Sequence, residues 1–178
     1  PMVLIGPVND REYAMKCADE ANGLVKYIPP LNQTELASAY CAASVHVQPS
    51  WFETVGLSSL EAAASGTPVV ATSRGAAKEY FEDKAVYVEP DNLESIKTGI
   101  LTAMKQGQNI AGNSEQPVGV EQKNKTEKKY YELKTYIRER FTWGKTAKDT
   151  LEVYEQVLAD DCTTKVKEAF YSQTYKLP

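Results

Sequence analysis

The fold of this 178-residue chain is decided by residues 45–70, which read VHVQPSWFETVGLSSLEAAASGTPVV. The stretch begins with a short β-prone run, and Pro49 ends it because proline cannot donate to a ladder of backbone hydrogen bonds. Thr54 then occupies a typical helix N-cap position, ahead of apolar residues at helical spacing. Gly66 ends this helix, and Pro68 opens a second apolar run. The stretch therefore predicts strand, loop, helix, turn and strand.

The predicted start of this helix is suited to an anion. Its first backbone amides have no acceptor within the helix; they belong to Thr54, Val55, Gly56 and Leu57. The positive end of the helix dipole lies at the same place, and both features favour a phosphate group. Gly56 carries no side chain, so a ligand can approach the backbone closely. We expect these amides to bind a diphosphate.

Two glutamates flank this predicted anion site. Glu53 lies on the loop before the helix, at the carboxyl end of a predicted strand. Glu61 follows the expected cap by almost two turns, a rise of roughly 10 Å, and so shares the face of Thr54. Its side chain tilts back toward the start of the helix. A carboxylate at that place can accept two hydrogen bonds from a ribose diol, as an acidic residue does in dinucleotide-binding folds.

These residues resemble the signature of a known family, the retaining glycosyltransferases of the GT-B fold. Glu53 and Glu61 form its Glu-x7-Glu pattern, within Pro-Ser, Glu-x-x-Gly-Leu and Glu-Ala-x-Ala-x-Gly-x-Pro-Val-Val. The resemblance implies that Glu53 contacts sugar hydroxyls or the reacting centre, and that Glu61 binds the ribose 2′- and 3′-hydroxyls. The helix amides would hold the diphosphate. Val55 departs from the family, which usually has phenylalanine there, but an amide contact does not depend on the side chain.

The resemblance covers residues 1–106 and 139–158, with weaker motifs outside the central signature. It implies that Leu31 and Gln33 line the base pocket and that Glu79 contacts the donor sugar. Glu79 could equally be an acid that the dipole favours at the start of a helix, and this alternative stays open.

Other residues near the signature have simpler interpretations. His46 alternates with valines in a strand, which favours a structural role. Arg74 and Lys78 could supply positive charge near a phosphate, although exposed surface charge is the ordinary case. We expect Tyr27 and Trp51 to be packing residues rather than groups that stack on a base.

The alternation of apolar runs and helical patterns predicts an α/β fold. It indicates a Rossmann-like, doubly wound parallel sheet with extra C-terminal helices. The resemblance implies that this sheet is the carboxyl-terminal half of a GT-B fold. The expected strands are 2–6, 24–28, 45–49, 68–72 and 85–89. The expected helices are 10–21, 33–43, 55–65, 76–82, 92–106, 127–140 and 143–160.

We predict four regions along the chain. Residues 1–106 form the nucleotide-sugar-binding domain, residues 107–126 a flexible insertion, residues 127–160 the closing helices and residues 161–178 a tail. The last helices carry apolar residues that we expect to be partly uncovered or to pack on a second copy of the chain, in a dimer or a crystal: Tyr130, Leu133, Ile137, Trp143, Leu151, Tyr154 and Leu158.

A complete GT-B enzyme has two Rossmann-like domains, and 178 residues make about one domain. Pro1 lies within a predicted strand. No residue matches the family's basic pair (an arginine and a lysine on the diphosphate), or the glycine-rich loop and histidine of the other domain. We therefore expect a fragment that lacks its first strand–helix unit and the N-terminal acceptor domain, and that is inactive by itself.

The composition is that of an ordinary globular domain, with 42% hydrophobic and 25% charged residues. A net charge of −4 gives no basic surface for nucleic acid. No apolar run approaches the roughly 20 residues that span a bilayer. The widely spaced Cys17, Cys41 and Cys162 argue for reduced thiols and a cytoplasmic location. Membrane association, at an inner face, would come only through the absent domain.

The resemblance implies a retaining glycosyltransferase of the hexosyltransferase type, acting in polysaccharide or glycoconjugate biosynthesis. Its co-substrate is a nucleoside-diphosphate sugar, with no other cofactor and no metal, since there is one histidine and no cysteine pair. Alternatives are a GT-B nucleotide-sugar epimerase and a non-catalytic nucleotide-binding module. A retaining glycosidase would need its two carboxylates about 5–5.5 Å apart. The base, the sugar, the acceptor and the oligomeric state stay open.

Overall fold

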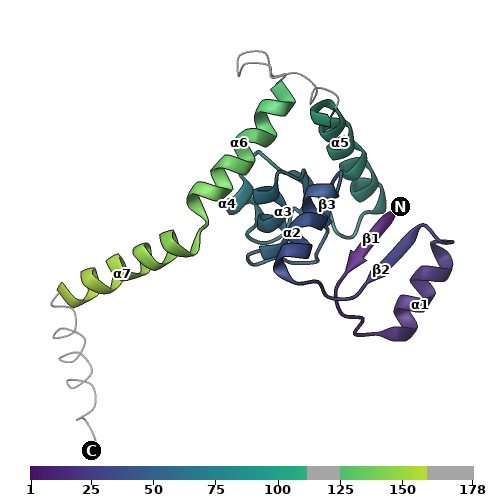
Figure 1. Cartoon of the computed structure of the whole chain (residues 1–178), viewed down its shortest axis with the longest axis horizontal. Helices are drawn as coiled ribbons and strands as arrows, with labels where there is room; N and C mark the ends of the chain where they lie inside the picture. The colour runs from purple at the N-terminus through teal and green to yellow at the C-terminus, as the bar shows by residue number, and fades with distance from the viewer. Residues whose placement is uncertain (112–124, 160–178) are drawn as a thin grey trace, which may run out of the picture. The chain divides into compact units, whose positions relative to one another are not determined.

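The computed structural model of the chain describes residues 1–111 and 125–159 (Figure 1). The elements follow in the order β1 (Met2–Ile5), α1 (Arg11–Glu20), β2 (Val25–Ile28), α2 (Gln33–Ala42), β3 (His46–Gln48), α3 (Leu57–Ser65), β4 (Val69–Thr72), α4 (Ala77–Phe81), β5 (Val86–Val88), α5 (Leu93–Ala111), α6 (Lys125–Arg140) and α7 (Trp143–Ala159). The predicted α/β class and the predicted order of strands and helices are confirmed.

The strands are parallel, but they form two sheets where we expected one. β1 pairs with β2, and β3, β4 and β5 form a separate sheet in that order. Among the described strands, none pairs with the second edge of β1 or of β3. The apolar residues of β1 are accordingly half exposed: Met2 by 47%, Val3 by 46% and Leu4 by 42%.

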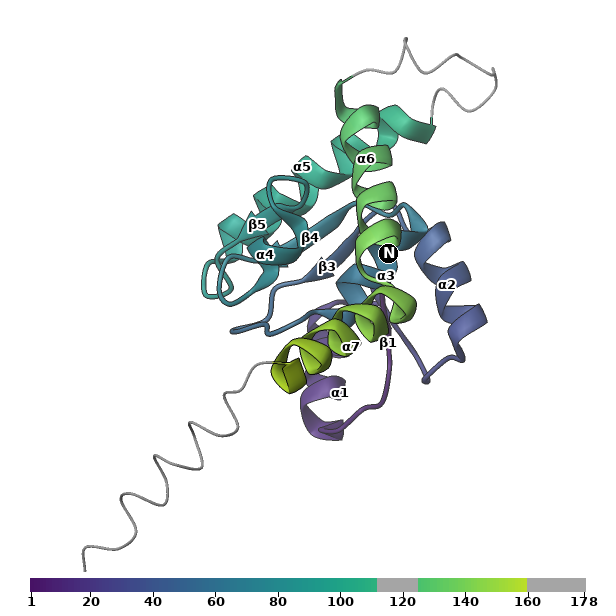
Figure 2. The ribbon, with the colours of Figure 1, turned by 90° about the vertical axis from the view of Figure 1, so that its left-hand side faces the viewer.

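The core lies around β4, the middle strand of the larger sheet. All four of its residues are buried, and α3 and α5 pack against it. Figure 2 shows β3, β4 and β5 side by side, with α5 along β5. Val70, Val88 and Ala103 form the centre of this packing. Gly99 lets α5 approach β5 closely, because a Cβ atom there would overlap the side chain of Val88.

The structure describes the four predicted regions only in part. Helix α5 continues to Ala111, beyond the predicted start of the insertion, and residues 112–124 of that insertion lie outside the described residues. The predicted tail, 161–178, lies outside them as well. The chain divides into two compact units, Pro1–Thr135 and Tyr136–Pro178, so the division falls within α6.

The apolar residues of the last helices behave in two ways. Leu133 and Ile137 of α6 are buried, with 1% and 2% exposed, so the prediction that they are uncovered is wrong. The exposed residues of α7 confirm it: Trp143 at 88%, Leu151 at 57%, Tyr154 at 63% and Leu158 at 82%. The side chain of Tyr130 lies outside the described residues.

Candidate functional site

Glu53 lies on the loop between β3 and α3, and this loop is anchored to the loop that follows β4. The N–H of Glu53 donates to the carbonyl of Arg74 at 3.4 Å, and its carbonyl accepts from the N–H of Ala76 at 2.8 Å. Gly75 between them has φ +89°, and a Cβ atom there would overlap the Glu53 carbonyl oxygen. The carboxyl ends of two neighbouring parallel strands therefore meet here, where ligands of open α/β sheets bind.

The Glu53 carboxylate accepts hydrogen bonds from four protein groups. Oε1 accepts from the backbone N–H groups of Thr54 and Gly56, both at 3.1 Å. Oε2 accepts from Nε2 of Gln48 at 2.7 Å and from Oγ of Ser50 at 3.3 Å. A carboxylate offers about four acceptor positions, so these donors fill its capacity. The half-buried side chain is held in one orientation.

Helix α3 begins later than expected, and Thr54 is not its N-cap. The N-cap is Gly56, in the left-handed region with φ 68°, and no side chain caps the helix there. The reason is that Glu53 itself takes the amides of Thr54 and Gly56. The expected C-terminal stop is confirmed, because Gly66 is the C-cap with φ 93°.

This shift divides the four amides expected to bind a diphosphate. Those of Thr54 and Gly56 are engaged by Glu53. Those of Val55 and Leu57 have no hydrogen-bond partner within the part of the chain that the structure describes. Two of the four predicted donors are thus available to a ligand without any rearrangement of Glu53.

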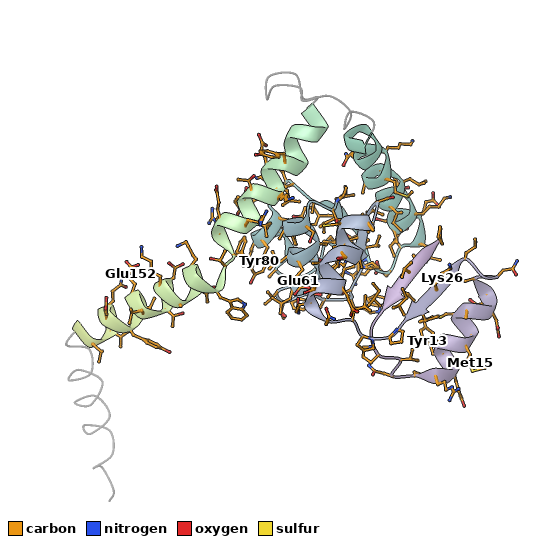
Figure 3. All side chains as sticks on the ribbon, in the orientation of Figure 1. Tyr13, Met15, Lys26, Glu61, Tyr80 and Glu152 are labelled. Carbon is orange, nitrogen blue, oxygen red and sulfur yellow. The ribbon has the colours of Figure 1, made fainter. Side chains whose placement is uncertain are left out.

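Glu61 is the fifth residue of α3 and is half-buried (Figure 3). Counted from Gly56, it lies about 1.4 turns and about 7.5 Å along the helix, so it does not share the face of the cap as expected. Oε2 of Glu61 accepts from the Tyr40 hydroxyl at 3.3 Å. Burial, with the nearby charge of Glu61, raises the pKa of Tyr40 to about 12, so this hydroxyl stays a donor at neutral pH.

The residues expected at the base pocket lie at the start of α2. Leu31 is half-buried and Gln33 is exposed. Between them, Asn32 caps α2 in a capping box with Glu35, with both hydrogen bonds at 3.0 Å. Within the described residues, no hydrogen bond joins Leu31 or Gln33 to either site glutamate.

Glu79 lies in the first turn of α4 with its side chain exposed. Its N–H donates to the carbonyl of Ala76, and Ala76 in turn donates to the carbonyl of Glu53. The structure therefore brings the start of α4 to the Glu53 loop, and both interpretations of Glu79 stay open.

Sequence reasoning missed the side chains that hold Gln48. Oε1 of Gln48 accepts from Ser58 Oγ at 2.5 Å and from Ser59 Oγ at 2.9 Å, and it lies 3.5 Å from Nε2 of His46. The same nitrogen of His46 lies 3.1 Å from Ser59 Oγ. Burial lowers the pKa of His46, which fits the structural role expected for it. Strand alternation was the available signal, because it places His46 and Gln48 on one face.

The charged residues near the site have protein partners. Arg74 forms an ion pair with Asp91 at 2.6 Å, and its Nε lies 3.7 Å from Glu89. The same guanidinium lies 5.6 Å from the ring centroid of Trp51. Trp51 is 68% exposed and Tyr27 38%, so neither belongs to the buried core. The ammonium group of Lys78 lies 5.6 Å from the ring centroid of Tyr87.

Two features are absent from the described residues. Residues 1–111 and 125–159 contain no cluster of three or more histidine, cysteine, aspartate or glutamate side chains able to hold a metal ion. In the same residues, none of the helices combines the length and the apolar character needed to cross a membrane.

Curated proteins with similar sequences are glycosyltransferases. The chain is 30% identical over 142 residues to D-inositol 3-phosphate glycosyltransferase 2 of Catenulispora acidiphila, covering 77% of this chain and 29% of that protein. It is 32% identical over 133 residues to an uncharacterized glycosyltransferase of Methanocaldococcus jannaschii, covering 74% and 30%. The chain thus spans under a third of the length of these relatives.

Solved structures of glycosyltransferases share the fold. Sucrose-phosphate synthase from Thermosynechococcus elongatus matches with a TM-score of 0.68 at 23% identity, over 88% of this chain and 38% of that one. The catalytic domain of starch synthase IV from Arabidopsis thaliana, bound to ADP and acarbose, matches with a TM-score of 0.60 at 17% identity, over 89% and 32%. These neighbours show the parallel-sheet α/β fold of GT-B enzymes.

A family model covers the region that contains both glutamates. The match extends over residues 1–106, more than half of the chain, and includes the loop of Glu53 and all of α3. On this ground, the chain belongs to the family of glycosyl transferases group 1.

Proposed function

We propose that this chain carries the donor site of a retaining glycosyltransferase that uses a nucleoside-diphosphate sugar. The observation that carries the proposal is the placement of two glutamates about one helix. Glu53 is fixed before the start of α3, at the carboxyl ends of β3 and β4. Glu61 lies farther along α3, and in the described residues the Tyr40 hydroxyl is the one side-chain donor to its carboxylate.

Each part of the donor has a matching group. Glu61 accepts hydrogen bonds from the ribose diol, since one hydroxyl donor leaves most of its acceptor positions open. The amides of Val55 and Leu57 donate to the diphosphate at the positive end of α3. Glu53 faces the sugar. Donors aimed at a leaving diphosphate stabilise the charge that develops on it, and one such group is worth about 3–4 kcal/mol.

The finer features of the activity form part of the same proposal. The sugar is a hexose, transferred in polysaccharide or glycoconjugate biosynthesis, and the enzyme works in the cytoplasm. The acceptor binds to a further domain. This part of the proposal is supported by the length of the relatives, each more than three times as long as the region that matches this chain. The 178-residue chain binds the donor but does not catalyse transfer of its sugar.

Calorimetric titration of the chain with UDP, GDP and ADP tests the donor site. We expect one of them to bind, and Glu61→Ala to weaken that binding at least about tenfold, because hydrogen bonds to a charged group are worth about 1.5–3 kcal/mol. Glu94→Ala is the matched control, since Glu94 is an exposed glutamate of α5 paired with Lys97. No binding at millimolar ligand, or equal binding by the Glu61→Ala chain, contradicts the proposal.

A further inference from the structure

Gln48 is the side chain that ties the Glu53 loop to the sheet. Three of the four donors to the Glu53 carboxylate, Ser50 and the amides of Thr54 and Gly56, belong to the same loop as Glu53. These donors lie on the segment between β3 and α3 that carries Glu53, whereas Gln48 belongs to the sheet. Gln48 is the last residue of β3, where it is in register with Ala71 of the buried strand β4. Its hydrogen bond to Glu53, at 2.7 Å, is also the shortest of the four.

Hydrogen bonds from α3 fix the orientation of the Gln48 side-chain amide. Its oxygen accepts from the hydroxyls of Ser58 and Ser59, in the first turn of α3. An amide oxygen is only an acceptor and the amide nitrogen only a donor. Rotating the amide would turn its nitrogen away from Glu53 and place its oxygen against a carboxylate. The hydroxyls of α3 therefore keep the N–H₂ group directed at Glu53.

We propose that Gln48 is a positioning residue of the donor site, holding the Glu53 carboxylate in the orientation that meets the sugar. The inference rests on the proposed function, because it deepens the role given there to Glu53. The bond from Ser50, at 3.3 Å, is the longest of the four, so a sugar hydroxyl replaces this donor on Oε2. Gln48 stays bound to the same oxygen and fixes the direction of its remaining lone pair.

Two substitutions distinguish the donor role of the Gln48 amide nitrogen from the acceptor role of its oxygen. Gln48→Met keeps the length of the side chain without its polar atoms. Gln48→Glu keeps an acceptor for Ser58 and Ser59 but replaces the donor to Glu53 with a second carboxylate. The control is Ser38→Ala, which removes an exposed hydroxyl that bonds within α2. Thermal melts of the variants show whether each one folds.

The first readout requires no ligand. The amide protons of Thr54 and Gly56 bond to Oε1 of Glu53, so their NMR shifts report the position of its carboxylate. We expect both shifts to change in Gln48→Met and Gln48→Glu and to stay in place in Ser38→Ala. If either folded Gln48 variant leaves both shifts unchanged, Gln48 does not position Glu53. This result is independent of whether the chain binds a nucleotide.

The second readout uses UDP, GDP and ADP beside their glucose conjugates. For the base that binds, we expect Gln48→Met to weaken the glucose conjugate about tenfold relative to the free diphosphate. In the Glu53→Ala background the same substitution has no effect, because Gln48 acts through Glu53. An equal loss in both backgrounds overturns the inference. If no diphosphate binds, the proposed function fails, while the amide shifts still decide the role of Gln48.

Discussion

Glu53 and Glu61 differ in how much hydrogen-bonding capacity the protein leaves them. Glu53 accepts from four protein donors, whereas the one side-chain donor to Glu61 in the described residues is Tyr40. A new ligand hydroxyl must displace a donor at Glu53, but it can join Tyr40 at Glu61. At the scale of the residue, Glu61 is therefore the open acceptor and Glu53 the fixed charge.

His46 gives a prediction for the dependence of stability on pH. Burial lowers its pKa below the ordinary 6.5, and this outweighs the opposite effect of its hydrogen bond to Gln48. Because the folded-state pKa is the lower one, the contribution of His46 to stability is full above the unfolded pKa. It is lost as pH falls through the folded pKa.

The imidazole titration is simple to measure, because the chain has one histidine. We expect its NMR signals to titrate below pH 6.5, and the urea midpoint to fall between neutral pH and pH 5. A His46→Gln chain should show a smaller fall over the same range. An imidazole that titrates at or above the ordinary value would falsify this account.

At the scale of elements, the contact between the two site loops depends on Gly75. In Gly75→Ala the new Cβ atom overlaps the backbone of Glu53. The alanine must also adopt the left-handed φ of +89° that Gly75 has. We expect a loss of at least about 2 kcal/mol in the free energy of unfolding, since the left-handed conformation costs roughly 1–2 kcal/mol and overpacking about 1–3. Urea denaturation measures it.

Gly23→Ala is the control for backbone strain alone. Gly23 has φ +78°, and a Cβ atom there would meet nothing within 4 Å. We expect a loss of about 1 kcal/mol for this variant. Equal losses for Gly23→Ala and Gly75→Ala would show that the approach of Glu53 to Gly75 is not as close as the structure has it.

The elements could be predicted because their signals are local. Apolar runs bounded by proline and glycine mark β3 and β4, and Gly66 marks the end of α3. The start of α3 could not be predicted, because the Glu53 carboxylate accepts from the amides of its own loop. It thereby replaces the cap that the sequence predicts for Thr54. Gln48 escaped notice since its partners Ser58 and Ser59 lie ten and eleven residues away in the chain.

At the scale of the whole molecule, the sequence predicted parallel strands but not which edges would pair. A repeating strand–helix pattern indicates parallel strands, because each helix returns the chain to the same end of the sheet. The neighbour of each strand depends on contacts between distant segments, and these leave β1 and β3 in separate sheets. The burial of Leu133 and Ile137 is likewise a tertiary feature that helical periodicity alone does not supply.

The exposed apolar residues of α7 predict how the chain binds a hydrophobic dye. We expect the double variant Leu151→Lys, Leu158→Lys to bind less dye, because 57% and 82% of these side chains are exposed. Its free energy of unfolding should change by less than about 0.5 kcal/mol per site. Leu133→Ala, at a site with 1% exposed, should lose about 2–5 kcal/mol and bind more dye. Unchanged dye fluorescence in the double variant would contradict the exposure of α7.

The separation of the two sheets also affects how fast each of them opens. Opening the ladder between β1 and β2 breaks no hydrogen bond of β3, β4 or β5, since no described strand is shared. Each ladder therefore has its own lifetime, and parts of a chain with few buried contacts open first. The half-exposed β1 should exchange its amide hydrogens with solvent well before the fully buried β4 does. The smaller sheet can unfold and re-form while the strands that position Glu53 remain intact.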